Sequence, residues 1–173
     1  MDLFQWMMGG LAILGVALAA PSFFQQLCGR PCIRLEAAEE QSGADLRLVV
    51  KVQNRSVLNP FLSLLRVRRV AADGLRALVE IREDGTARLL AAASALNGHN
   101  FRLVPGGDSV RVEVARVRSE GQAVVGDAVH GRAEQPLPPG RYHASVMVDW
   151  VGGRATLSQP FDVGCAAPVL AWS

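Results

Sequence analysis

Residue types that carry chemistry are scarce in this 173-residue chain, which has three cysteines, three histidines, one tyrosine and a single lysine. Three cysteines are too few for a small disulfide scaffold, and a net charge of +2 excludes a histone-like polycation. The sequence contains neither H-E-x-x-H nor G-x-S-x-G, so it offers no zinc-protease helix and no nucleophile elbow. Half of the residues are apolar, which is enough for a packed core.

Charged residues are also absent from positions 3–29. A helix that spans a bilayer needs about 20 mostly apolar residues, and residues 3–20 nearly reach that length. Pro21 lacks the N–H that a continuing helix would use, so it ends or kinks the helix. We therefore expect residues 1–28 to form a hydrophobic membrane anchor. Its candidates for contact with lipid are Trp6, Leu11, Ile13, Leu14, Val16, Leu18, Phe23 and Phe24.

Two alternatives remain open for this uncharged run. A cleaved secretory signal is compatible with the small residues near Ala20, but a signal carries Lys or Arg ahead of its apolar core, and here only Asp2 is charged. The missing positive charge favours a retained anchor. A helix that packs against other membrane proteins without spanning is compatible with a stripe of small residues, namely Gly9, Gly10, Gly15 and Ala19.

The segment after the run carries arginine and cysteine. Lys and Arg beside a span stay on the cytoplasmic side, and Arg30 and Arg34 lie only after the run. We therefore expect the rest of the chain on the cytoplasmic side of a bacterial inner membrane, with the periplasm as the alternative. Cys28 and Cys32 are too few for a zinc site, even with Cys165, and reduced thiols are favoured over a disulfide.

The remainder of the chain reads as a β domain. Residues that favour turns separate apolar segments, several of which alternate with period two. Together these segments predict about seven strands and a mainly β fold, an antiparallel sandwich preceded by one hydrophobic α-helix. The candidate strands are residues 46–53, 61–70, 77–82, 86–90, 101–104, 109–117, 141–150, 155–158 and 161–163.

Three segments between these strands carry other patterns. Residues 36–45 are polar and indicate a linker or short helix, and residues 89–96 are rich in alanine and indicate a short helix or loop. Residues 120–135 are polar and contain glycine, which predicts a long loop. We therefore divide the chain into a membrane anchor at 1–28, a linker at 29–45, a β domain at 46–164 and an apolar tail at 165–173.

Two of the strands show their faces clearly. Residues 109–117 alternate but slip register near Ala115. Residues 141–150 keep strict period two, which places one set of side chains on a single face: Tyr142, Ala144, Val146, Val148 and Trp150.

The segment Leu137-Pro-Pro-Gly-Arg-Tyr142 resembles the part of immunoglobulin-like and fibronectin-type-III sandwiches that carries the tyrosine corner. The piece from Val52-Gln-Asn54 through Phe101-Arg-Leu-Val-Pro-Gly106 is similar to early strands of chaperone-like and sperm-protein-like sandwiches. The resemblance covers about residues 46–163 and implies an Ig-like fold in which the tyrosine hydroxyl bonds to nearby backbone. Structural roles are expected for Tyr142, Gly140 and Trp150. The paired core cysteines of antibody domains are absent, and no functional residue is carried over.

No arrangement of residues predicts catalysis. His143 and Asp149 share a strand face but stand about 20 Å apart along it. Asp127 and His130 lie in the same expected loop, where a solvated pair is favoured over a metal site. We therefore expect no enzyme activity, no cofactor, no metal site and no small-molecule substrate.

Arginine accounts for 17 of the 18 basic residues. Aromatic side chains at nucleic-acid-binding spacing are lacking, so we expect no nucleic-acid partner. The planar guanidinium suits protein interfaces and lipid phosphate, and tryptophan is enriched in interfaces. Packing against its own domain is an equal possibility for the tail tryptophan. The candidates for contact with a partner are Arg66, Arg68, Arg69 and Trp172.

These observations favour a non-enzymatic, membrane-anchored subunit that stabilises a larger bacterial membrane assembly, for example a respiratory or photosynthetic one. Its expected partners are integral membrane subunits and the lipid bilayer. The alternative is an exported periplasmic Ig-like binding or chaperone-like module whose signal peptide has been removed.

Overall fold

The computed structural model describes residues 15, 19, 22–26, 28–56, 68–85, 89–97, 101–118, 120–125, 134–164 and 170–173. For residues 90–97 it describes the strand pairing of the backbone but not the side chains. This part of the chain is mainly β. Its strands are β1 (Ile33–Ser42), β2 (Asp45–Asn54), β3 (Ala72–Asp73), β4 (Arg76–Glu83), β5 (Leu89–Asn97), β6 (Arg102–Leu103), β7 (Val110–Val117), β8 (Ala123–Val125), β9 (Gln135–Pro136), β10 (Gly140–Trp150), β11 (Gly153–Val163) and β12 (Leu170–Trp172).

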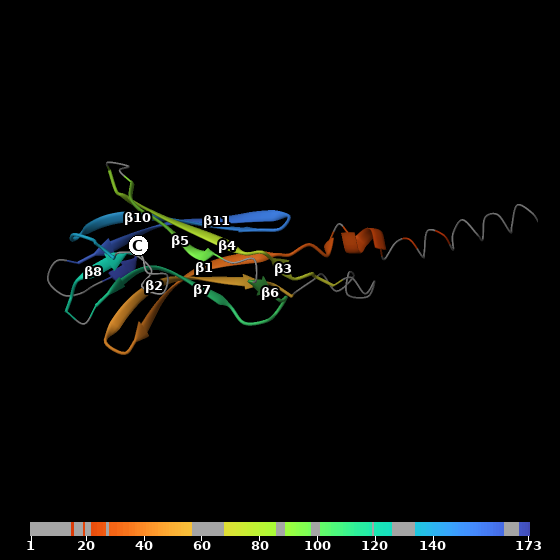
Figure 1. Ribbon diagram of the computed structural model, residues 1–173, viewed down its shortest axis with the longest axis horizontal. Coiled ribbons are helices and arrows are strands. Elements are labelled where there is room, and N and C mark those ends of the chain that lie inside the picture. The colour runs from red at the N-terminus through yellow and green to blue at the C-terminus, as the bar shows by residue number, and fades with distance from the viewer. Residues whose placement is uncertain are drawn as a thin grey trace, which may run out of the picture.

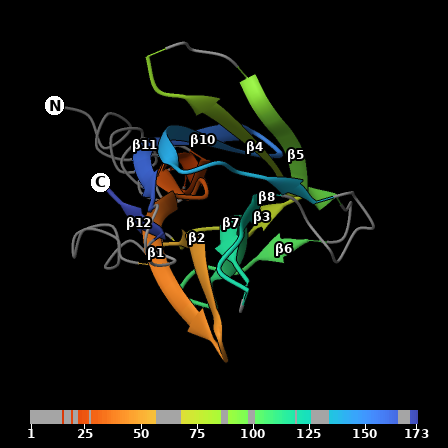
Figure 2. The ribbon, with the colours of Figure 1, turned by 90° about the vertical axis from the view of Figure 1, so that its left-hand side faces the viewer.

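These strands form two five-stranded antiparallel sheets and one short two-stranded sheet (Figure 1). The first large sheet has the order β1-β2-β7-β8-β9, and the second has the order β12-β11-β10-β4-β5. Seen along the long axis of the molecule, β1, β2 and β7 make one layer and β11, β10, β4 and β5 the other (Figure 2). The pair β3-β6 lies at the end where the N-terminal segment joins (Figure 1).

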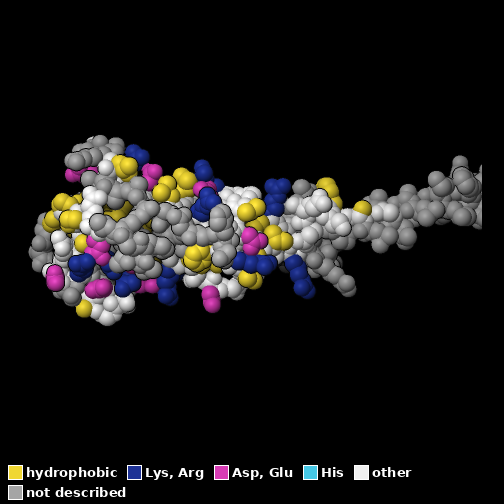
Figure 3. All heavy atoms as spheres, in the orientation of Figure 1, with side chains coloured by type: hydrophobic (Ala, Val, Ile, Leu, Met, Phe, Trp, Pro, Cys, Tyr) yellow, Lys and Arg dark blue, Asp and Glu magenta, His cyan; other side chains and the backbone are white. Residues whose placement is uncertain are grey.

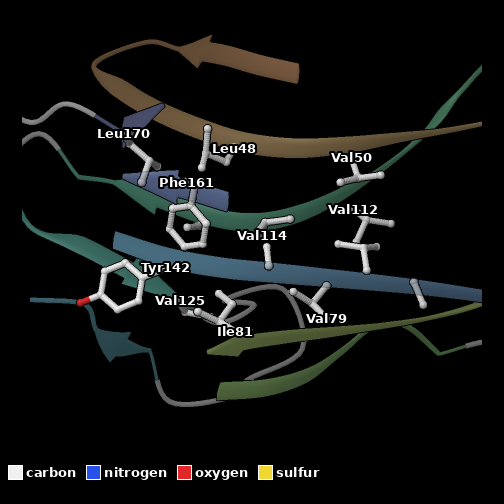
Figure 4. Close-up of a cluster of buried hydrophobic side chains, with 14 of the residues drawn as sticks. Leu48, Val50, Val79, Ile81, Val112, Val114, Val125, Tyr142, Phe161 and Leu170 are labelled. Atoms are coloured by element: carbon white, nitrogen blue, oxygen red, sulfur yellow. The ribbon is translucent and has the colours of Figure 1, made fainter. Parts of the chain in front are cut away.

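One hydrophobic core fills the space between the two layers. Its side chains come from alternate positions of the central strands, so period-two patterning produces it directly. Leu48, Val50, Val112 and Val114 enter from one sheet and meet side chains from the other (Figure 4). The side chains from the second sheet include Val79, Ile81, Tyr142 and Phe161.

The faces expected for two strands are confirmed. In β10, the side chains from Tyr142 to Val148 alternate between buried and half-buried, and Trp150 packs against the core. In β7, the register shifts where Leu48 pairs with Ala115 and the next residue, Val49, pairs with Glu113. The extra residue on β7 is a β-bulge, which explains the slip in its alternation.

The linker expected at 29–45 is wrong over Ile33–Ser42, which forms β1 and pairs with β2 along its full length. The polar residues that indicated a linker lie on the outer face of the sheet. There the Glu40 carboxylate lies 3.1 Å from both Lys51 Nζ and Arg111 Nε. Ile33 and Leu35 pack against the core from the inner face of β1. β1 is therefore a half-buried strand that contributes few residues to the core.

The helix or loop expected at 89–96 is also wrong, because these residues form β5 and pair with β4. The preference of alanine for helix is weak. The backbone hydrogen bonds that β5 forms with the edge of β4 outweigh that preference. Of the strand expected at 61–70, residues 68–70 are described and are not in a strand. The two segments expected at 155–158 and 161–163 join into the single strand β11.

The last residues of the tail expected at 165–173 also belong to a sheet. Leu170–Trp172 forms β12, which pairs with β11. The Trp172 indole donates a hydrogen bond to the Ala38 carbonyl at 3.1 Å, and its ring meets Phe161 edge-on at 6.0 Å. This strand therefore joins the edge of the second sheet to β1 of the first. The described contacts of Trp172 are made within the domain.

The N-terminal region is described in part. Gly15, Ala19, residues 22–26 and Cys28 are helical. Phe23 is largely exposed and meets Phe24 edge-on. Within the described positions, no helix has the length and apolar character needed to cross a membrane. The other expected anchor residues lie outside the described positions: Trp6, Leu11, Ile13, Leu14, Val16 and Leu18.

Candidate functional site at the base of the domain

The end of the β domain that receives the N-terminal segment is the candidate site, and we call it the base (Figure 1). Hydrogen bonds bring together segments that are far apart in the sequence. The base consists of residues 28–32, Arg55, residues 68–76, residues 101–106 and the β10–β11 turn at Val151. The Val151 amide donates to the Asp73 carbonyl at 3.0 Å, which places the β10–β11 turn beside β3.

Asn54, the last residue of β2, joins three of these segments. Its side chain is buried, its Oδ1 accepts the Cys32 amide at 3.0 Å, and its Nδ2 donates to the carbonyls of Val70 and Leu103 at 2.9 and 3.0 Å. Its own carbonyl accepts the Gly106 amide at 2.8 Å. Asn54 is the only buried polar residue of the described chain, and its hydrogen-bonding groups are paired, as a stable interior requires.

Gln25 attaches the N-terminal helical residues to this base. Its side-chain amide pairs with the backbone of Arg68 in both directions: Oε1 accepts the Arg68 amide at 2.9 Å, and Nε2 donates to the Arg68 carbonyl at 2.6 Å. The Gly29 amide donates to the Gln25 carbonyl at 2.9 Å, and the Val70 amide donates to the Gly29 carbonyl at 2.7 Å. The end of the uncharged run is therefore hydrogen-bonded to the domain.

Gly29 leaves no room for a side chain at this junction. A Cβ there would lie 2.4 Å from the Gln25 carbonyl oxygen and 2.9 Å from that of Arg68. Both contacts are with backbone, so a larger residue would force the helical segment and the domain apart. The close approach of the two parts thus depends on glycine.

Loss of the Gln25 side chain should loosen this junction. In Gln25→Ala, the Arg68 amide loses its acceptor, and we expect its hydrogen exchange to accelerate about fivefold, as for a hydrogen bond worth about 1 kcal/mol. Gln26→Ala is the matched control, because Gln26 is exposed. Hydrogen exchange followed by mass spectrometry measures both. Equal protection of Arg68 in the two variants would show that Gln25 does not hold the segment.

Arginines without a carboxylate partner gather at the base. Most described arginines lie within 4 Å of a carboxylate, as Arg34 does with Glu36 and Arg102 with Asp73. Within the described residues, four arginines have no such ion pair, and all four belong to the base: Arg30, Arg55, Arg68 and Arg76. Arg69 adds a hydrogen bond from its guanidinium to the Arg30 carbonyl at 3.2 Å.

Exposed apolar side chains occur at the same end. Phe101, Val104, Val70 and Val151 all belong to the base, and their exposed fractions run from 41% at Phe101 to 76% at Val151. Figure 3 shows yellow and dark blue side chains side by side where the domain meets the N-terminal segment. The base is therefore both apolar and cationic, and its apolar groups face solvent.

The other sequence candidates lie elsewhere in the fold. Tyr142 packs in the core with its hydroxyl donating to the Pro138 carbonyl at 2.5 Å, which is the contact that a tyrosine corner implies. Burial, and secondarily the Glu83 carboxylate, raises the pKa of the Tyr142 hydroxyl, so it stays a hydrogen-bond donor at neutral pH. A Cβ at Gly140 would contact the Tyr142 ring, and the Trp150 ring covers Gly153.

Two further features of the described chain lie outside the base. A pocket of about 330 Å³ lies between residues 121–123, 136–139 and 163–164, and no residue of that lining is ionisable. On the outer face of the first sheet, Glu134 pairs with both Arg116 and Arg118, and Arg47 pairs with Glu113. The described residues contain no cluster of three potential metal ligands. Asp127 and His130 lie outside the described positions.

Two of the arginines expected to contact a partner lie in the base. Arg68 and Arg69 were candidates and lie in it, while Arg66 lies outside the described residues. Asn54 and Gln25 were missed as functional positions, because their partners are distant in sequence and no local motif marks them. The structure also leaves Cys28 and Cys32 as free thiols at the base. Compared with known proteins, the chain matches no family model and no curated sequence.

Proposed function

We propose that the protein is a non-enzymatic, membrane-anchored interaction subunit whose β domain is held in a fixed orientation against its anchor. The observation that carries this proposal is the hydrogen-bonded junction of Gln25 and Gly29 with Arg68 and Val70. It joins the uncharged run of residues 3–29 directly to the domain. A flexible linker would let the domain reorient freely, whereas this junction fixes its direction, which suits a structural subunit.

We also propose that the domain is an Ig-like sandwich. The order β1-β2-β7 matches strands A, B and E of that fold, and β11-β10-β4 matches strands G, F and C. Tyr142 stands near the start of β10, which is the position of the tyrosine corner on strand F. The strands β5, β8, β9 and β12 would be additions to this common arrangement.

The edge of the second sheet supports contact with neighbouring protein subunits. Among the described strands, β5 ends this sheet, and its sequence from Leu89 to Asn97 carries no charged residue. Edge strands of monomeric proteins are usually protected by charge or proline, because their free backbone groups can pair with another chain. A strand of a neighbouring subunit is the partner that fits this edge.

Native purification tests the proposal. The full chain, isolated with mild detergent from washed membranes, should co-purify with integral membrane proteins at a fixed stoichiometry. As a matched pair, Leu14→Arg should reduce membrane association, because arginine costs about 3 kcal/mol at the centre of a span, whereas Leu14→Ile should not. Recovery of the unaltered chain as a soluble monomer would contradict the proposed function.

A further inference from the structure

We propose that the base of the β domain rests directly on the anionic headgroups of a lipid bilayer. This inference rests on the proposed function, since it requires the uncharged run to be in the membrane. It adds that the domain makes its own contact with lipid, through apolar side chains at the acyl boundary and arginines at the phosphates. The domain would then lie on the bilayer rather than stand away from it.

The position of the base relative to the uncharged run is the first argument. Arg30 is the first charged residue after the run, and the preceding residue, Gly29, is hydrogen-bonded to Val70 at 2.7 Å. No spacer therefore separates the run from the domain. If the run enters a bilayer, the base is the part of the domain nearest to its surface.

The charges of the base are the second argument. Arg30, Arg55, Arg68 and Arg76 have no carboxylate partner within the described residues, whereas arginines on the outer faces of both sheets do. Guanidinium groups bind phosphate oxygens in two-pronged geometry and are attracted to anionic leaflets.

The carboxylates of the base do not cancel this charge. Asp73 is paired with Arg102 at 3.3 Å, and Asp149 with Arg154 at 2.5 Å. Asp108, in the turn before β7, is exposed and lies outside the residues of the base.

The apolar side chains of the base identify lipid as the occupant. Seven large hydrophobic side chains are exposed in the described chain. Leu78 and Leu89 lie on the second sheet, Phe23 lies in the helical segment beside the base, and the other four belong to the base. Interspersed valine, phenylalanine and arginine match an interface that has hydrocarbon below and phosphate above. Nucleic acid would use the arginines but would leave Val104 and Val151 exposed to water.

A tryptophan introduced at Val151 tests this contact in the full chain. Val151→Trp would be reconstituted in vesicles of brominated phosphatidylglycerol, and its fluorescence compared with that of the unaltered chain to subtract the native tryptophans. We expect the added signal to fall about twofold, as for a side chain that reaches the headgroup–acyl boundary. Ala44→Trp, in the β1–β2 turn at the opposite end of the domain, should lose almost nothing (Figure 1).

The arginine contribution is tested by a matched pair of double variants in the Val151→Trp background. Arg30→Gln with Arg68→Gln should weaken the quenching in phosphatidylglycerol vesicles. Arg82→Gln with Arg141→Gln removes the same charge from positions paired with Glu80 and Asp84 and should leave it unchanged. Brominated phosphatidylcholine vesicles should give weaker quenching than phosphatidylglycerol vesicles.

The outcomes separate the two proposals. If the full chain does not float with vesicles, the proposed function fails, and the lipid contact fails with it. If the chain floats but Val151→Trp is not quenched, the base does not touch lipid, and only this inference is overturned. If the tryptophan of Val151→Trp is shielded from water in the natively purified assembly but not in pure lipid vesicles, the base contacts a protein partner. That result would also overturn the inference. Equal quenching in both lipids would overturn the anionic selectivity.

Discussion

Replacing Asn54 by leucine is expected to lower the free energy of unfolding by about 3 kcal/mol. Leucine has a similar volume but cannot pair with the Cys32 amide or with the carbonyls of Val70 and Leu103. These groups would stay buried without partners, and each costs about 1–3 kcal/mol when unsatisfied. Urea denaturation monitored by circular dichroism measures the change. The loss should also loosen the base, because this one side chain pairs with all three segments.

Gln53→Leu is the control for this prediction. Gln53 precedes Asn54 on β2 but is exposed, so its replacement should change stability by no more than about 0.5 kcal/mol. Asn54→Leu and Gln53→Leu with equal stability would mean that the side chain of Asn54 does not hold the base together.

Replacing Phe161 by alanine should destabilise the domain by about 3–5 kcal/mol, the usual cost of removing a buried aromatic ring. Phe161 is fully buried, stacks on Tyr142 at 5.5 Å and meets Trp172 edge-on. Its removal would leave a cavity between Tyr142 and β12, the strand that joins the two sheets. Thermal and chemical denaturation measure the effect.

Phe101→Ala makes the same chemical change at an exposed position and is the matched control. It should cost less than Phe161→Ala, because 41% of Phe101 is already exposed in the folded domain, whereas Phe161 is fully buried. The membrane contact proposed for the base would still be affected, so the two variants separate stability from attachment. A Phe161→Ala domain as stable as Phe101→Ala would contradict the packing described for the core.

The strands at the centre of the fold were predictable from the sequence. β2, β4, β7 and β10 have apolar residues at every second position, because one face of each meets the core and the other meets solvent. The β-bulge in β7 was visible for the same reason, since an extra residue moves the apolar positions by one. Local pattern sufficed wherever burial on one face dominates.

The strands at the sheet edges were not predictable in the same way. β1 carries Ala and Glu, and β5 carries mostly Ala and Leu, and both compositions favour helix over strand. Their conformation is decided by pairing with β2 and β4, which is a tertiary effect. The short strand β12 has too few residues to show any period.

Only the separate sequence features of the base could be predicted, and not their arrangement in space. The uncharged run and the cluster at Arg68 and Arg69 were evident as sequence features. Their proximity to Asn54 and Phe101 was not, because it depends on β2, β3 and β6 ending at the same side of the fold. Residues that act by joining distant segments leave no local pattern, and Gln25 is the clearest example.

The strand β12 also has a consequence for the rate at which the domain forms. Trp172 and Glu39, which are hydrogen-bonded, are 133 residues apart, and the central pairings β2–β7 and β4–β10 also join distant segments. Folding slows as contacts become less local, so we expect milliseconds to seconds rather than microseconds. The hairpins β1–β2 and β10–β11 can form early, whereas the contact that closes the two sheets must wait for both. Until then the apolar inner faces of the two sheets are exposed, and the folding chain is most prone to aggregate in that interval.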